Sequence, residues 1–202
     1  MWKEDGFVKL EEIESLLDLN ELHQEILMEE KLSADKQYKK YEDYECEVWC
    51  FWNDYLTYQR EILKRNIKAP NIVDIGCHLG LQSIIFDIPY IGIDAEDNGK
   101  FFWDKLDNKY FVGLFPNEKL NHLVDGNIVI SNMSLGYRNG IDLKEAALVL
   151  QRAKAIFISA PEEFVELVVQ GGGFNIVTLK APEKLSHGYI SGKFLLEREA
   201  NG

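Results

Sequence analysis

The chain has 202 residues, the size of one ordinary domain or of one domain with an added helical segment. Hydrophobic residues make up 46% of it, enough for a full core, and no apolar run is long enough to span a membrane. The net charge of −12 argues against general binding to nucleic acid. Three cysteines do not indicate a disulfide framework and no secretory signal is visible, so we expect a cytoplasmic protein.

Residues 1–69 are predicted to form an N-terminal helical segment, because their apolar side chains recur every three or four positions. A second, aromatic-rich helix is expected to run toward residue 68, since Pro70 closes the segment. Its aromatic face could cover a ligand as a lid, but packing against the rest of the protein is the commoner use of such a face. Both readings stay open at this point.

The stretch at residues 71–83 carries the strongest functional signal. Residues 71–75 are an apolar run with Asp74 near its end, which is typical of a buried parallel strand that ends at a site. Gly76 and Gly80 then bracket a tight turn, and residues 81–86 can begin a helix. A strand, a glycine turn and a helix in this order let a ligand approach the main chain where a side chain would block it.

A second apolar run, at residues 90–93, ends at Asp94. Asp94 lies 20 residues after Asp74. A carboxylate about 20 residues after a glycine turn is what a ribose-binding βαβ unit supplies. The two acids and the turn between them therefore predict a nucleoside site.

These residues resemble the cofactor-binding signature of the class I, Rossmann-like S-adenosylmethionine-dependent methyltransferases. In that family a strand ends in Asp/Glu-x-Gly-x-Gly-x-Gly, and the second strand ends in an acid that holds the ribose hydroxyls. The match here runs from Asp74 to Gly80, with His78 in place of the middle glycine, and continues at Asp94. The nicotinamide signature G-x-G-x-x-G fits the glycine spacing less well.

From residue 71 onward the pattern alternates between strands and helices. Further strands are expected at residues 109–113, 127–132, 155–159, 174–179 and 189–197, and helices at 100–106, 142–153 and from Pro161 to the glycines at 171–173. The fold class is therefore α/β: a Rossmann-like, mostly parallel seven-stranded sheet with helices on both faces, preceded by the N-terminal helical segment. Residues 70–202 would be the cofactor-binding domain, and the resemblance implies that its last strand is antiparallel to the rest.

The resemblance implies S-adenosylmethionine as the cofactor. The main chain of the turn would approach its methionine part and ribose, Asp94 would take the ribose hydroxyls, and Ala95 would lie against adenine. The third strand lacks the acid that often binds the adenine amino group, so the contact near Leu114 would be apolar or from backbone. The residues to which cofactor-binding roles are assigned on this basis are Asp74, Gly76, Cys77, His78, Gly80, Asp94, Ala95, Leu114 and Asn132.

No catalytic side chain is obligatory for methyl transfer if the acceptor is already nucleophilic, so the catalytic residue is unknown. Candidates are Asn132, Tyr137 and His78. For His78, an exposed turn residue without a catalytic role is the better interpretation. For Asn132, a cap between strand and loop is as good an interpretation as a catalytic role. The Asn/Asp-Pro-Pro-aromatic signature of enzymes that methylate exocyclic amines or amide nitrogens is absent. No metal site is indicated.

The leading hypothesis is a methyltransferase that acts on a small molecule or a protein side chain. The alternative is a catalytically inactive, methyltransferase-like interaction protein that lost its cofactor through His78 and the missing acid of the third strand. A third possibility is another nucleotide-linked Rossmann enzyme. The sequence reveals neither the acceptor nor the oligomeric state.

Overall fold

The computed structural model describes residues 54–78, 80–97, 108–137, 140–184 and 190–198. The expected helices before residue 54 and the expected helix at 100–106 lie outside these ranges. The chain divides into two units, Met1–Glu61 and Ile62–Gly202, and the fold described below is that of the second. The predicted division after residue 69 stays a prediction.

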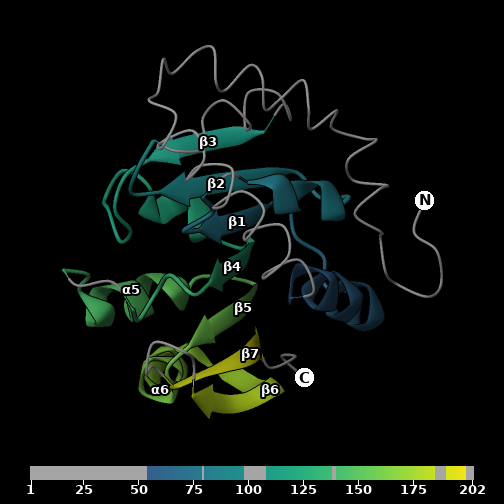
Figure 1. Ribbon diagram of the computed structural model, residues 1–202, viewed down its shortest axis with the longest axis vertical. Helices are drawn as coiled ribbons and strands as arrows, with labels where there is room; N and C mark the ends of the chain where they lie inside the picture. Colours follow the sequence, from purple (N-terminus) through teal and green to yellow (C-terminus); the bar gives the residue numbers. More distant parts are fainter. Residues whose placement is uncertain (1–53, 79, 98–107, 138–139, 185–189, 199–202) are drawn as a thin grey trace, which may run out of the picture. The chain divides into compact units, whose positions relative to one another are not determined.

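A single seven-stranded sheet organises the second unit, with the strand order β3-β2-β1-β4-β5-β7-β6 (Figure 1). Strands β1 to β5 are all parallel, whereas β7 runs antiparallel to both of its neighbours, β5 and β6. The predicted sheet and its antiparallel last strand are therefore confirmed. The strands are β1 (Ile72–Ile75), β2 (Tyr90–Asp94), β3 (Lys109–Val112), β4 (Ile128–Asn132), β5 (Ala155–Ala160), β6 (Phe174–Lys184) and β7 (Ile190–Arg198).

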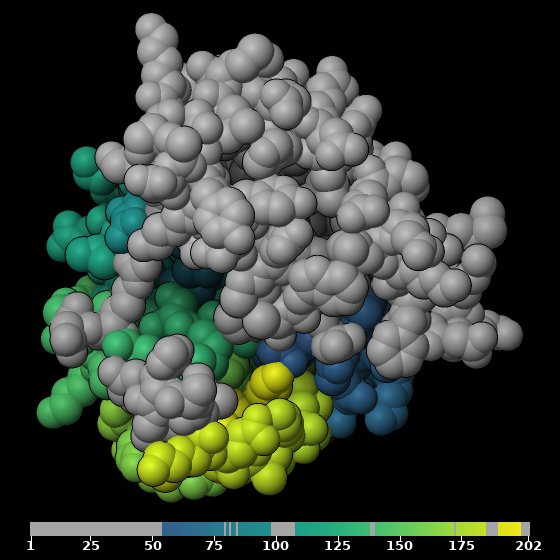
Figure 2. Space-filling view, in the orientation of Figure 1, coloured from purple at the N-terminus to yellow at the C-terminus, as the bar shows by residue number. Residues whose placement is uncertain are grey.

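The position of each strand in the sheet explains its composition. Every residue of β1, β2, β4 and β5 is buried, as expected for inner parallel strands that are covered on both faces. By contrast, most residues of the edge strand β6 are exposed or half-buried, and its pairing with β7 is interrupted by register shifts. Figure 2 shows the C-terminal strands exposed along one margin of the described surface.

Two α-helices follow the prediction closely. Helix α5 (Leu143–Leu150) begins after Asp142, whose carboxylate accepts hydrogen bonds from the backbone N–H groups of Lys144 and Glu145 at 3.0 Å. Helix α6 (Glu162–Gly172) begins after Pro161 and ends at Gly173, which has a φ of 61°. Helix α5 is shorter than the predicted 142–153 because its end tightens into turns over residues 151–153.

The helix predicted at residues 81–86 is instead one 3-10 turn, η1 (Leu81–Ile85). Only a few residues separate it from β2, and Phe86 is already extended. A second 3-10 turn, η2 (Asn121–Val124), precedes β4.

The helix that was expected to run toward residue 68 ends earlier; its described part covers residues 54–65. Asn66 takes a left-handed φ of 53°. The N–H of Asn66 bonds the Leu63 carbonyl at 3.1 Å, and the N–H of Ile67 bonds the Ile62 carbonyl at 3.0 Å. This pair of bonds is a Schellman motif, so asparagine and not Pro70 stops the helix.

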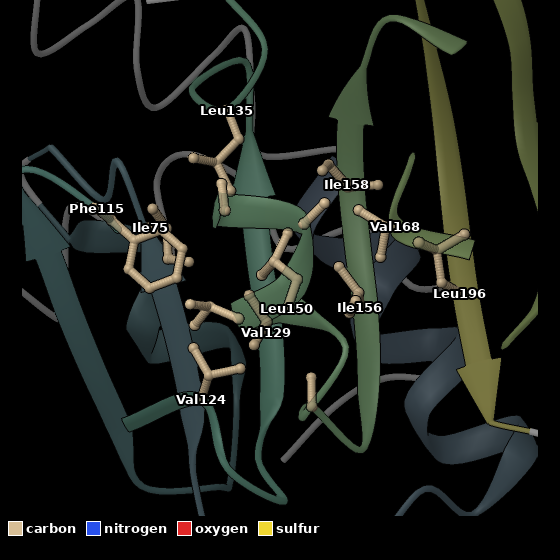
Figure 3. Packing of buried hydrophobic residues seen from close by; sticks show 14 of the residues in the cluster. Ile75, Phe115, Val124, Val129, Leu135, Leu150, Ile156, Ile158, Val168 and Leu196 are labelled. Carbon is tan, nitrogen blue, oxygen red and sulfur yellow. The ribbon is translucent and has the colours of Figure 1, made fainter. Parts of the chain in front are cut away.

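A large cluster of buried hydrophobic residues lies on one face of the sheet, beneath α5, α6 and η2. Figure 3 shows Ile75, Val129 and Ile156 of the strands meeting Leu150 of α5 and Val168 of α6. On the other face, η1 leads into Phe86, whose ring stacks on Tyr90 with centroids 5.5 Å apart. Helical elements thus cover both faces, as predicted. Within the described residues, no helix is long and apolar enough to cross a membrane.

Candidate functional site

The glycine turn after β1 is built from backbone conformations that favour glycine. Gly76 and Gly80 have φ values of 78° and 73°. His78, which stands where the resemblance expects the middle glycine, has a φ of 47°. A left-handed conformation costs an L-residue about 1–2 kcal/mol. His78 therefore adopts the backbone conformation of the glycine it replaces, at an energetic cost, and it does not line the neighbouring cleft.

The turn is anchored to the end of β2. The N–H of Gly76 donates to the Ile93 carbonyl at 2.7 Å, and the N–H of His78 donates to Oδ2 of Asp94 at 2.9 Å. The other oxygen of Asp94, Oδ1, accepts the N–H of Glu96 at 3.1 Å. Because an ionised carboxylate offers about four lone-pair sites, Asp94 can also accept hydrogen bonds from two ligand hydroxyls.

A cleft, partly open to solvent, lies where β1, β2 and β4 end and where the chain leaves β3. Ligands of open α/β sheets bind in this position, outside the carboxyl ends of the strands. The cleft has one carboxylate, which could bind ribose hydroxyls, and mostly apolar walls, which could contact a base. The lining residues are Ile75, Gly76, Ile93, Asp94, Ala95, Gly113, Leu114, Phe115, Ser134, Leu135 and Ile141.

Four of the predicted site residues line this cleft: Gly76, Asp94, Ala95 and Leu114. Asp94 supplies the charge, and the half-exposed Leu114 supplies an apolar surface at the end of β3. Leu114 and the neighbouring Phe115 fit the expectation that a base would be held there by apolar contact.

Ser134 is a cleft residue that the site prediction did not include. An added Cβ on Gly76 would lie 2.2 Å from Oγ of Ser134, so only glycine lets the segment after β4 approach the turn this closely. Its place just after the fourth strand already predicts that Ser134 lies at the site, because parallel strands present their loops to the same edge, but no binding role was assigned to it.

Asp74 lies away from the cleft and is completely buried. Its Oδ2 atom accepts the Gln82 amide at 2.6 Å and the Tyr90 hydroxyl at 2.8 Å. Gln82 also donates to the carbonyl of Cys77 at 3.0 Å. No local pattern of residues indicates these partners of Asp74, because their meeting depends on the pairing of β1 with β2 and on the path of η1.

Cys77 and Gly80 are also buried and do not line the cleft. The N–H of Gly80 donates to the carbonyl of Cys77 at 3.0 Å, which closes the turn. The side chain of Cys77 has an exposed fraction of 1%. These two residues shape the turn from within.

Asn132 ends β4, is nearly buried and pairs with Ser159 of β5. Beside it lies a group of hydroxyls: Oγ of Ser159 is 3.0 Å from Oγ of Ser191 and 3.4 Å from Sδ of Met133. Burial raises the pKa of Tyr137, and the Ser191 side chain only partly opposes that shift, so the Tyr137 phenol is protonated at neutral pH.

No metal centre accompanies the cleft: among the described residues, no three His, Cys, Asp or Glu side chains gather closely enough to hold an ion.

Several solved methyltransferase structures are similar to this fold. WbdD, described as a bifunctional kinase-methyltransferase, matches over 74% of this chain with a TM-score of 0.56 and 13% identity. The chain has the class I methyltransferase fold. It spans about 40% of the length of WbdD, so the likeness concerns one part of that protein.

Two further structures are matched over most of their own length. The putative RNA methyltransferase PH1948 from Pyrococcus horikoshii has 16% identity and a TM-score of 0.54, with 74% of this chain and 84% of that chain covered. Magnesium protoporphyrin IX methyltransferase (ChlM) from Synechocystis PCC 6803, solved with bound SAH, has 14% identity and a TM-score of 0.53, with 73% and 83% covered. No family model and no curated protein matches the sequence.

Proposed function

We propose that this protein is an S-adenosylmethionine-dependent methyltransferase that acts on a small molecule or a protein side chain. The observation that carries the proposal is the position of Asp94, whose carboxylate lines the cleft while it holds the glycine turn through the N–H of His78. The class I fold and an acid at the end of β2 support an adenosyl ligand at this edge of the sheet.

The assigned binding roles follow from where the residues lie. Asp94 accepts hydrogen bonds from the ribose hydroxyls, and Ala95 and Leu114 contact the adenine. The main chain at Gly76, Cys77, His78 and Gly80 shapes the cradle, and Asp74 orients it from below. Asn132, at the end of β4, lies on the side where donor and acceptor would meet.

When bound, S-adenosylmethionine supplies an electrophilic methyl group, so the chain's own task is to position the reactants and exclude water. Tyr137, protonated at neutral pH, serves as a hydrogen-bond donor to an acceptor. A general base at Tyr137 is not part of this proposal. The acceptor class and a cytoplasmic location stay predictions.

Calorimetry of the full chain with S-adenosylmethionine and S-adenosylhomocysteine tests the proposal. We expect saturable binding of both ligands in the micromolar range. Absence of binding heat at millimolar ligand would favour the alternative, a methyltransferase-like interaction protein without cofactor. Mass spectrometry of the denatured protein would independently identify a co-purified nucleoside.

A further inference from the structure

Three buried polar side chains meet beneath the glycine turn. Asp74, Tyr90 and Gln82 have exposed fractions of 0%, 3% and 4%, and none of them lines the cleft. In the parallel register Asp74 lies opposite Gly92, which has no side chain beyond Cα. Tyr90, two residues earlier on the same face of β2, therefore reaches the carboxylate of Asp74 with its hydroxyl.

The amide of Gln82 joins this group to the main chain of the turn. Nε2 of Gln82 donates to Oδ2 of Asp74 at 2.6 Å and to the carbonyl oxygen of Cys77 at 3.0 Å. Both partners are acceptors, and the amide nitrogen is the group with two protons to give. Tyr90 donates to the same carboxylate oxygen of Asp74, at 2.8 Å.

The turn that Gln82 holds also meets the cleft acid. One residue beyond the carbonyl that Gln82 binds, the N–H of His78 donates to Asp94 at 2.9 Å. The carbonyl of Cys77 and the N–H of His78 belong to the same peptide unit, which is planar. A hydrogen bond that fixes the carbonyl therefore also fixes the direction of the N–H toward Asp94.

We propose that Gln82 is a positioning residue, which ties the buried carboxylate of Asp74 to the Cys77–His78 peptide and so aims the His78 N–H at the carboxylate of Asp94. Asp74 thus acts on the site through Gln82 and not by contact with a ligand. The expected effect of Gln82 on cofactor affinity rests on the proposed function, whereas its expected effect on the conformation of the turn does not.

The matched pair Gln82→Met and Tyr90→Phe tests the proposal in the full chain. Each variant keeps the size of its side chain and removes one hydrogen bond to Oδ2 of Asp74. Gln82→Met also removes the bond to the Cys77 carbonyl, so it should lose somewhat more stability to urea than Tyr90→Phe. Only Gln82→Met cuts the link to the turn. Calorimetry should show S-adenosylhomocysteine affinity reduced about tenfold or more in Gln82→Met and by less than about twofold in Tyr90→Phe, since one net hydrogen bond corresponds to roughly a factor of ten.

A second measurement needs no ligand. Hydrogen exchange of the His78 amide should be faster in Gln82→Met than in wild type, and unchanged in Tyr90→Phe. Equal exchange in the two variants, or equal affinity losses, would overturn the positioning role. If wild type binds no S-adenosylhomocysteine, the proposed function fails, while the exchange experiment still decides for or against Gln82.

Discussion

The glycine turn has an open side and a buried side, and each is held by one of the two acids found in the sequence. On the open side, Asp94 lines the cleft but is itself only 5% exposed, and it accepts hydrogen bonds from the main-chain N–H groups of the half-buried His78 and the exposed Glu96. On the buried side, Asp74 binds side-chain donors that water does not reach. The same residue type therefore serves a ligand in one place and the framework in the other, because the surroundings decide which donors each carboxylate meets.

The largest expected effect is on stability, at the buried side. Asp74→Ala leaves the Gln82 amide and the Tyr90 hydroxyl without their buried acceptor, and we expect the free energy of unfolding to fall by about 3–5 kcal/mol. Urea denaturation measures this loss. Asp87→Ala removes the same charge from an exposed position and should change stability by less than about 0.5 kcal/mol. A loss below about 1 kcal/mol in Asp74→Ala would erase the distinction between the two sides.

The next effect is on ligand affinity, at the open side. Asp94→Ala removes the acceptor proposed for both ribose hydroxyls, and we expect the Kd for S-adenosylhomocysteine to rise about 100-fold, since hydrogen bonds to a charged group contribute about 1.5–3 kcal/mol. Its stability loss should be smaller than that of Asp74→Ala, because water can replace the carboxylate at His78 and Glu96. Calorimetry with Asp87→Ala as the charge control measures the change. An unchanged Kd would remove Asp94 from the ribose role.

Glycine variants separate crowding from backbone strain. Gly76→Ala and Gly126→Ala both place alanine at a positive φ, 78° and 69°, but only the Cβ at Gly76 would meet another atom, Oγ of Ser134 at 2.2 Å. We expect left-handed strain of about 1–2 kcal/mol in both variants and a further loss of about 1–3 kcal/mol from crowding in Gly76→Ala. Urea denaturation of both measures the difference. Adding Ser134→Gly to Gly76→Ala should recover the crowding part; equal losses in the two single variants would contradict it.

The smallest effect concerns pH. Burial raises the pKa of Tyr137 in the folded protein above its unfolded value of about 10, so the folded state holds this proton more tightly. The stability that this proton contributes is fully present below pH 10 and is lost as pH rises through the folded pKa. In Tyr137→Phe the decline of unfolding free energy above about pH 10 should be shallower than in wild type. Identical pH profiles from pH 8 to 11 would contradict the shift.

Local pattern was enough to predict the sheet and much of the cleft. The buried runs of β1, β2, β4 and β5 are mostly apolar, and the acid that ends β2 follows the glycine turn at the spacing a nucleoside site needs. Because parallel strands end at one edge, those facts already placed Gly76 and Asp94 near one another, whereas Ala95 and Leu114 were expected at the site from the family resemblance. The ends of helices were predicted less accurately. Asn66, in a left-handed conformation, ends a helix that was predicted to continue toward Pro70.

What only the tertiary structure decided is which side chains meet. Asp74 reads in the sequence as a strand-end acid beside a site, yet the pairing of β1 with β2 places it against Tyr90, and η1 brings Gln82 onto it. Ser134 reaches Gly76 across two strands that are far apart in the sequence. Spacing along a chain fixes the period of an element and the atoms at its end, whereas long-range partners depend on strand order and register, which no local run of residues specifies.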